Sequence, residues 1–113
     1  MQNPKARMTP LLTQEQFEEV YATGQQALIY FTADWCGACK RIDWEFLMEE
    51  FPELPVYLCD IDVNKYTPGF CGVRSIPNFM LVTGPSKAAG PHQSSDTAKV
   101  ATWITITTVK SKN

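Results

Sequence analysis

The stretch that decides the fold is Trp35-Cys36-Gly37-Ala38-Cys39-Lys40, and Ser75-Ile76-Pro77 follows it further along the chain. The two cysteines are three positions apart, and residues at i and i+3 lie on one face of a helix. A disulfide can join them if their Cα atoms lie roughly 4.4–6.8 Å apart. If Cys36 lies at a helix N-terminus, backbone N–H groups and the helix dipole favour its thiolate. A nucleophilic thiol beside its own resolving thiol is the minimum that thiol–disulfide exchange requires.

Length and composition predict one domain. The chain has 113 residues, of which 44% are hydrophobic, and this is enough to bury one moderate core. We expect a leader over residues 1–9, the domain over residues 10–110 and a tail over residues 111–113. The formal net charge of −2 gives no sign of a nucleic-acid partner. No apolar run reaches the ~20 residues of a membrane span, so we expect a cytoplasmic protein without a membrane contact.

Strands and helices alternate along the chain. Thr13 and Gln16 form a capping box that begins a helix, and Gly24 is a plausible end for it. The apolar run 27–32 is typical of a strand covered on both faces. A second helix is expected from Cys39 to about Glu50, with Ile42 and Phe46 facing inward.

The second half of the chain predicts three strands and a final helix, with a short helix or turn after the polar connection that contains Asn64, Pro68 and Gly69. The strands are expected at 56–61, at 78–82 and, as a very short edge strand, at 87–89. Ser94 or Ser95 would cap the last helix, although the β-branched run 104–109 locally prefers a strand. The whole order predicts an α/β fold with a mixed sheet, in which the thiols follow the carboxyl end of a strand.

These residues resemble the thioredoxin family. The similarity covers roughly residues 10–110 and rests on three segments: the stretch 31–40 that contains both cysteines, Asp60-Ile61-Asp62, and Gly72-Val73-Arg74-Ser75-Ile76-Pro77. The family pattern around the thiols is W-C-G-P-C-K, and before the proline it is G-[IV]-x-x-[IV]-P. The resemblance implies a thioredoxin-like fold, with a central mixed sheet flanked by helices.

The resemblance also implies an activity and roles for individual residues. Cys36 would be the attacking thiol and Cys39 the resolving thiol of a protein-disulfide oxidoreductase. The supporting site residues would be Trp35, Gly37, Ala38, Ile76 and Pro77, with Pro77 as a cis-proline facing the thiols. The family further implies a monomer that binds no cofactor, reduces protein disulfides and receives electrons from an NADPH-linked thioredoxin reductase.

Departures from the family pattern concern the surroundings of the thiols. Ala38 stands where the family has proline, and loss of that proline is expected to make the disulfide more oxidising. Tyr30 and Leu58 stand where the family has a buried Asp and its Lys partner. Three alternatives then remain for Cys39. Its proton leaves through water, or another carboxylate such as Asp60 accepts it, or the second exchange step is slow. Trp44 replaces a kinking proline, so we expect a straighter second helix.

Other readings of the same residues are weaker. A zinc site needs two more ligands than Cys36 and Cys39 supply, so no metal is expected. Cys59 is expected to be a buried inert thiol, and Cys71 a thiol near the rim of the site. The alternative function is a binding module that stabilises another protein, such as a replication factor, without using the thiols. A variant with serine at both Cys36 and Cys39 would separate the two functions.

Overall fold

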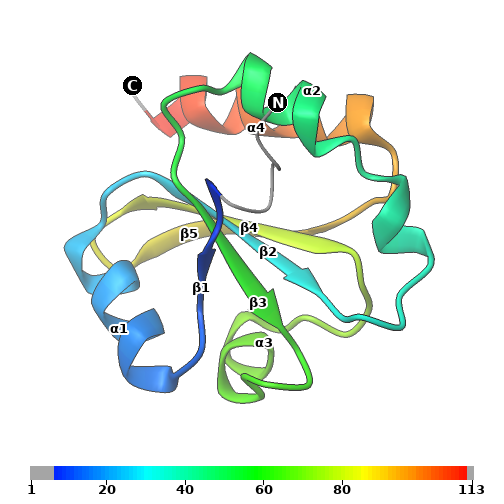
Figure 1. Ribbon diagram of the computed structural model, residues 1–113. Helices are drawn as coiled ribbons and strands as arrows, with labels where there is room; N and C mark the ends of the chain where they lie inside the picture. The colour runs from blue at the N-terminus through cyan, green and yellow to red at the C-terminus, as the bar shows by residue number, and fades with distance from the viewer. Residues whose placement is uncertain (1–6, 112–113) are drawn as a thin grey trace.

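A five-stranded mixed sheet with the order β1-β3-β2-β4-β5 forms the centre of this computed structural model, which describes residues 7–111 (Figure 1). Strand β3 pairs in parallel with β1 and with β2, whereas β4 pairs antiparallel with β2 and with β5. The strands are β1 (Thr9–Pro10), β2 (Ala27–Thr32), β3 (Val56–Asp60), β4 (Asn78–Gly84) and β5 (Lys87–Gln93).

Helices cover both faces of this sheet. Helices α1 (Gln14–Thr23) and α3 (Tyr66–Cys71) lie on one face, and α2 (Trp44–Glu50) and α4 (Thr97–Ser111) lie on the other (Figure 1). The order of strands and helices confirms the order predicted from the sequence. Helix α4 also contains the run 104–109, so packing and helical context override its local preference for a strand.

The central strand β2 divides the core into two halves. Its side chains alternate between the two faces of the sheet. Leu28 and Tyr30 belong to the core on the α2/α4 face, and Ile29 and Phe31 belong to the core on the α1/α3 face. All four are buried, which explains why this strand is a continuous apolar run in the sequence.

Local signals in the sequence set both ends of α1. The Thr13 side chain accepts a hydrogen bond from the Gln16 backbone N–H at 3.1 Å, as the capping box predicts. The Gln16 side chain reaches back one residue further, because its Oε1 accepts from the Leu12 N–H at 2.7 Å. Gly24 ends the helix in the left-handed region, with φ 71°.

The expected single helix after the cysteines is wrong. A 3₁₀ helix (Ala38–Arg41) comes first, and α2 begins separately at Trp44. Asp43 caps α2, since its side chain accepts from the Phe46 N–H, and its own N–H donates to the Thr97 side chain of α4 at 2.9 Å. Replacing the family's proline by Trp44 therefore does not produce a straighter helix.

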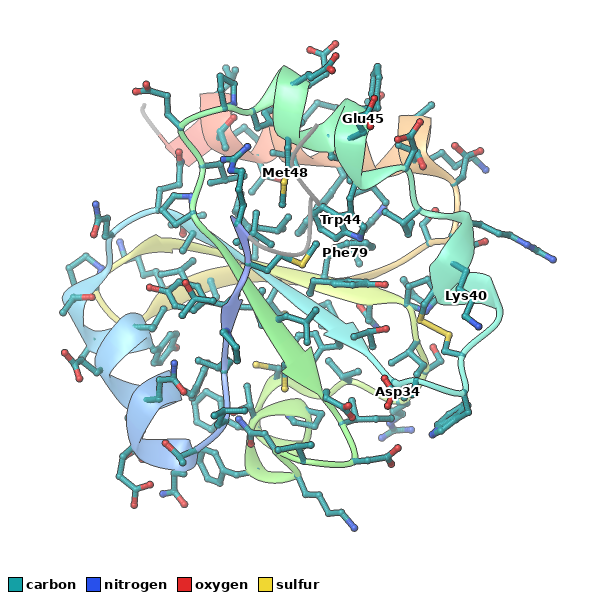
Figure 2. All side chains as sticks on the ribbon, viewed as in Figure 1. Asp34, Lys40, Trp44, Glu45, Met48 and Phe79 are labelled. Atoms are coloured by element: carbon teal, nitrogen blue, oxygen red, sulfur yellow. A yellow bond between two sulfur atoms is a disulfide. The ribbon has the colours of Figure 1, made fainter. Side chains whose placement is uncertain are left out.

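The change of helix phase also decides which side chains of α2 are buried. Phe46 is 42% exposed, contrary to the expectation that it faces inward, whereas Ile42 is buried as expected. Trp44, Leu47 and Met48 form the buried face instead. Figure 2 shows Trp44 extending from α2 toward Phe79 of the sheet, with Glu45 pointing away from it.

The second half of the domain differs from the expectation at two places. Strand β5 continues to Gln93, because it pairs with β4 over most of its length despite a sequence with little strand preference. His92 therefore lies in a strand, where its ring stacks on Trp103 of α4 at 4.8 Å. The cap before α4 is Asp96, whose side chain accepts from the Lys99 N–H, rather than Ser94 or Ser95.

The N-terminal boundary also differs from the expected leader over residues 1–9. Residues 1–6 lie outside the described part of the chain, but Met8 is buried in the core and Thr9 begins β1. At the other end, Ser111 closes α4, and residues 112–113 of the expected tail are not described. Among residues 7–111, none of the helices has the length and apolar character needed to span a membrane.

Candidate functional site

The two cysteines of the C-x-x-C stretch form a disulfide beyond the carboxyl end of β2. A turn follows the strand, in which the Cys36 N–H donates to the Ala33 carbonyl at 3.1 Å. The Cα atoms of Cys36 and Cys39 are 5.4 Å apart, within the range that allows a bridge. Each cysteine is 5% exposed, so burial alone does not distinguish their roles.

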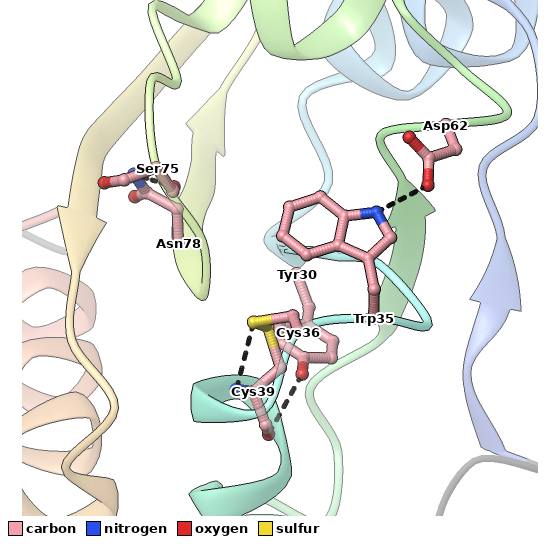
Figure 3. Close-up of a disulfide and its surroundings, with 7 residues drawn as sticks. All are labelled: Tyr30, Trp35, Cys36, Cys39, Asp62, Ser75 and Asn78. Carbon is pink, nitrogen blue, oxygen red and sulfur yellow. Dashed lines mark hydrogen bonds between the residues drawn. A yellow bond between two sulfur atoms is a disulfide. The ribbon is translucent and has the colours of Figure 1, made fainter.

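Cys36 does not lie at the N-terminus of a long helix, contrary to the expectation from the sequence. The helix that follows it is the four-residue 3₁₀ helix, and Gly37 is its N-cap. A helix this short has little dipole to offer. A direct contact takes its place, since the Cys39 backbone N–H points at the Cys36 sulfur with a donor–acceptor distance of 3.1 Å (Figure 3). This donor is in position to stabilise negative charge on that sulfur.

Tyr30 lies behind the disulfide on β2 (Figure 3). Its hydroxyl donates a hydrogen bond to the Cys39 carbonyl oxygen at 3.4 Å. Its ring stacks on Phe79, with centroids 5.4 Å apart, and packs obliquely against Trp44 at 4.8 Å. Burial raises the pKa of Tyr30, while the side chains of Thr32 and Trp44 partly lower it. Tyr30 therefore supports the backbone of Cys39 and is a poor base near neutral pH.

Trp35 stands beside the disulfide and is 67% exposed. Its indole N–H donates to an Oδ of Asp62 at 2.9 Å, and this bond fixes the ring orientation (Figure 3). An exposed apolar ring held in one orientation is suited to contact a partner.

The segment before β4 brings Ile76 and Pro77 to the other side of the site. Ile76 is half-buried, Pro77 is fully buried, and the peptide bond between them is cis. The buried Asn78 amide donates to the Ser75 carbonyl at 3.1 Å, and its Oδ1 accepts from the Phe79 N–H. Asn78 thus holds both ends of this segment. The sequence analysis missed this role, because the buried position of the amide depends on the pairing of β4 in the sheet.

An apolar groove of about 540 Å³ runs from Trp35 toward α3. We call it the substrate-side groove. Its floor is apolar, and it carries two cationic side chains. The groove is lined by Trp35, Ile61, Lys65, Pro68, Gly69, Val73, Arg74, Ser75 and Ile76.

Gly37 and Ala38, the two residues between the cysteines, differ in their exposure. Gly37 is exposed in the right-handed helical region, and a Cβ added there would meet no atom within 4 Å. Ala38 is half-buried against the α2/α4 core. Gly37 therefore is not required for steric reasons.

Cys59 and Cys71 lie apart from the disulfide, on the α1/α3 side of the sheet. Cys59 is fully buried, and burial, reinforced by the nearby Cys71 and Asp60, raises its pKa to about 12. Cys71 ends α3, and burial raises its pKa to about 11. Within residues 7–111, no three His, Cys, Asp or Glu side chains come together as ligands for a metal ion.

Comparisons with known proteins agree with this geometry. The family model described as Thioredoxin matches residues 8–106. The thioredoxin of Thiocapsa roseopersicina is 38% identical over 74 residues, which are 62% of this chain and 81% of that protein. The thioredoxin of Chlamydia muridarum is 34% identical over 76 residues, which are 66% of this chain and 74% of that protein.

Solved structures give the same fold. The X-ray structure of Fasciola hepatica thioredoxin superposes with a TM-score of 0.76 and 26% identity, covering 88% of this chain and 98% of that one. The oxidised form of mitochondrial thioredoxin 3 from Saccharomyces cerevisiae gives a TM-score of 0.81 over 92% of this chain and 99% of that one, at 22% identity. The second likeness supports the fold alone.

Proposed function

Because the chain belongs to the thioredoxin family and is a thiol–disulfide oxidoreductase that acts on protein disulfides, we propose that Cys36 attacks the substrate and Cys39 resolves the product. The Cys36 thiolate attacks one sulfur of a substrate disulfide and releases the other as a thiolate. Cys39 then attacks Cys36, which frees the second substrate sulfur and leaves the Cys36–Cys39 bridge. Two electrons pass from the protein dithiol to the substrate.

The single observation that carries this assignment is the hydrogen bond from the Cys39 N–H to the Cys36 sulfur. A donor aimed at one sulfur favours the thiolate there, and the thiolate is the nucleophile. This contact distinguishes the two cysteines, which are equally buried.

The substrate-side groove supports a site for the substrate chain. Trp35 and Ile76 are on its lining and flank the disulfide from two sides. We propose that an extended segment next to the substrate disulfide lies between them, beside the Pro77 turn. Gly37 and Ala38, which lie between the two cysteines in the chain, complete the proposed set of supporting residues.

Trapping the mixed disulfide tests the assignment. In the Cys39→Ser variant the intermediate cannot be resolved, so a protein disulfide substrate should accumulate as a stoichiometric adduct on Cys36. The matched Cys36→Ser variant should form less than about a tenth of this adduct. Peptide mapping by mass spectrometry identifies the cysteine, and an adduct on Cys39, or equal adducts in both variants, would refute the assignment.

The proposal extends to the electron donor, the oligomeric state and the cellular compartment. We propose that an NADPH-linked thioredoxin reductase restores the dithiol, that the protein acts as a monomer and that it works in the cytoplasm, whose reducing poise maintains a dithiol. Oxidation of NADPH in the presence of such a reductase, and the mass in solution by light scattering, test the first two. Fractionation of the source cell tests the third.

A further inference from the structure

A second pocket lies beneath the disulfide, on the side toward the sheet. Its volume is about 430 Å³, enough for several water molecules. We call it the proton pocket. It is lined by Tyr30, Thr32, Ala33, Asp34, Cys36, Cys39, Lys40, Ile42, Trp44, Leu58 and Asp60. Both cysteines therefore border a space with polar and apolar walls that the proposed path of the substrate chain does not use.

Strands β2 and β3 form the floor of the proton pocket, and their register decides which side chains lie next to each other there. Tyr30 pairs with Leu58, and Thr32 pairs with Asp60, across the parallel strands β2 and β3. Tyr30 and Leu58 pack in the core on the α2/α4 face. Because side chains two positions apart share a face, Thr32 and Asp60 lie on the same face, directly beyond them. The Asp60 carboxylate thus lies at the end of the floor, bordering the same space as Cys39.

Asp60 is half-buried and held in place. Its Oδ1 accepts a hydrogen bond from the Asp62 N–H at 2.9 Å, so a carboxylate oxygen remains to accept from the pocket. The pocket also contains a buried donor, the Trp44 indole N–H. It lies close enough to the Tyr30 hydroxyl to lower the pKa of that group, but it has no partner at full hydrogen-bond geometry within residues 7–111. A space with such a donor and a carboxylate acceptor is suited to ordered water.

Three other polar side chains of the pocket, Tyr30, Thr32 and Lys40, have no acceptor for a proton at neutral pH. Tyr30 already donates its hydroxyl proton to the Cys39 carbonyl, Thr32 is a neutral hydroxyl, and Lys40 is a cation. Asp34 is the second carboxylate of the lining, and it is exposed in the turn before Trp35. Figure 2 places Asp34 and Lys40 on either side of the disulfide.

We propose that Asp60 accepts the proton of the Cys39 thiol, through water in the proton pocket, when Cys39 attacks the mixed disulfide on Cys36. The inference rests on the proposed function. As the proton passes to Asp60, the sulfur of Cys39 forms a bond with the sulfur of Cys36. The bond between Cys36 and the substrate sulfur breaks, and its electron pair leaves with that sulfur. The substrate thiolate then takes a proton from Asp60 or from solvent.

Several other charged or titratable groups lie around Asp60. Lys40 comes from the 3₁₀ helix, Asp34 from the turn after β2, and Tyr30 from β2. Asp62 follows on the same loop, and Cys59 precedes Asp60 on β3.

Rapid mixing of the reduced protein with a peptide disulfide separates the two chemical steps. The attack of Cys36 is bimolecular, second-order overall and first-order in peptide, whereas the resolution by Cys39 is unimolecular, first-order overall, and limits the rate at high peptide concentration. In the Asp60→Asn variant, which keeps an acceptor for the Asp62 N–H, the first-order rate at pH 7 should fall at least tenfold. It should then rise about tenfold per pH unit between pH 6 and 8, because it follows the thiolate fraction of Cys39. The second-order rate should change less than twofold.

Two variants serve as controls. Asp34→Asn removes the other carboxylate of the lining and should leave both rates within twofold of the unchanged protein. Asp60→Glu keeps a carboxylate at the same position and should recover most of the first-order rate, even if Asp60→Asn is less stable. Thermal unfolding of each variant shows whether it is folded under the conditions of the assay.

The outcomes are distinguishable. If Asp60→Asn leaves the first-order rate and its pH profile unchanged, or if Asp34→Asn lowers that rate as much, the proposed proton acceptor is wrong. Equal losses in both rates for Asp60→Asn would refute it as well. If instead no adduct forms on Cys36 in the second-order phase, the proposed function itself fails, whatever the role of Asp60.

Discussion

The cores on the two faces of the sheet contain two cysteines each, in surroundings that differ strongly. On the α2/α4 face, Cys36 and Cys39 border the proton pocket, and a backbone N–H points at the Cys36 sulfur. On the α1/α3 face, Cys59 and Cys71 pack against an apolar core, and burial raises the pKa of both thiols.

Under the proposed assignment of Cys36 as the nucleophile, the degree of burial does not determine thiol reactivity. Cys36 is 5% exposed and Cys59 is fully buried, so both are core residues by area. They differ in the groups around the sulfur. A thiolate needs a donor or a cation beside it and water within reach, and an apolar core supplies neither.

The largest expected effect is on the rate of catalysed disulfide reduction. Cys36→Ser should lower the catalysed reduction of a protein disulfide by more than about 100-fold, because a serine hydroxyl cannot form the mixed disulfide. Cys59→Ala combined with Cys71→Ser should keep the rate within about twofold. The rate of reduction with a dithiol as electron source measures both, and a large loss in the second variant would place a functional thiol on the α1/α3 face.

Tyr30→Asp should give the next largest effect, on stability. The change removes a ring that packs against Phe79 and Trp44, and it places a carboxylate opposite the apolar Leu58. A buried charge without a partner and the lost packing together predict a loss of about 3–5 kcal/mol in the free energy of unfolding.

Tyr30→Phe is the matched control for that change. It keeps the ring and removes only the hydrogen bond to the Cys39 carbonyl, which is worth about 1 kcal/mol. Urea unfolding of the reduced proteins measures both values. Similar losses for the two variants would mean that the hydroxyl, rather than the packing of the ring, stabilises this face.

Serine substitutions on the α1/α3 face should have smaller and unequal effects. Cys59→Ser places a hydroxyl among apolar side chains and should cost about 1–3 kcal/mol of unfolding free energy. Cys71→Ser, at the half-buried end of α3, should cost less than about 0.5 kcal/mol. Equal losses of unfolding free energy at the two positions would mean that burial of the cysteine does not determine the cost of the serine substitution.

The smallest expected change is in redox potential. Ala38 is the first residue of the 3₁₀ helix, a position where the fixed φ of proline is tolerated. By the family pattern, the unchanged protein should be more oxidising than thioredoxin's roughly −270 mV by a few tens of millivolts. Ala38→Pro should lower its potential, as measured by equilibration with a dithiol buffer. If the unchanged protein has a redox potential at or below that of thioredoxin, Ala38 does not make the disulfide more oxidising.

Much of this arrangement could be predicted from local sequence. The ends of α1 follow from Thr13 and Gly24, because each acts on the backbone beside it. The apolar run of β2 and the spacing of Cys36 and Cys39 likewise depend on neighbours in the chain. Such signals set the order of the elements and the position of the disulfide.

The remainder depends on contacts between residues far apart in the chain. The helix is interrupted before Trp44, where the Asp43 N–H donates a hydrogen bond to the Thr97 side chain of α4. The sequence near Asp43 does not indicate this partner. Strand β5 extends because β4 offers a partner for its backbone. The role of Asn78 and the placement of Asp60 beneath the disulfide similarly require the finished sheet.

The most direct test of the central claim is the order in which the four thiols of the reduced protein react. Limited alkylation with iodoacetamide between pH 5.5 and 8, followed by peptide mapping, gives a rate for each cysteine. We predict that Cys36 reacts first and keeps reacting below pH 7. Cys59 and Cys71 should remain unlabelled, since a thiol with a pKa of about 11 is ionised in roughly one molecule in ten thousand at pH 7. Faster labelling of Cys39, Cys59 or Cys71 than of Cys36 would contradict the account.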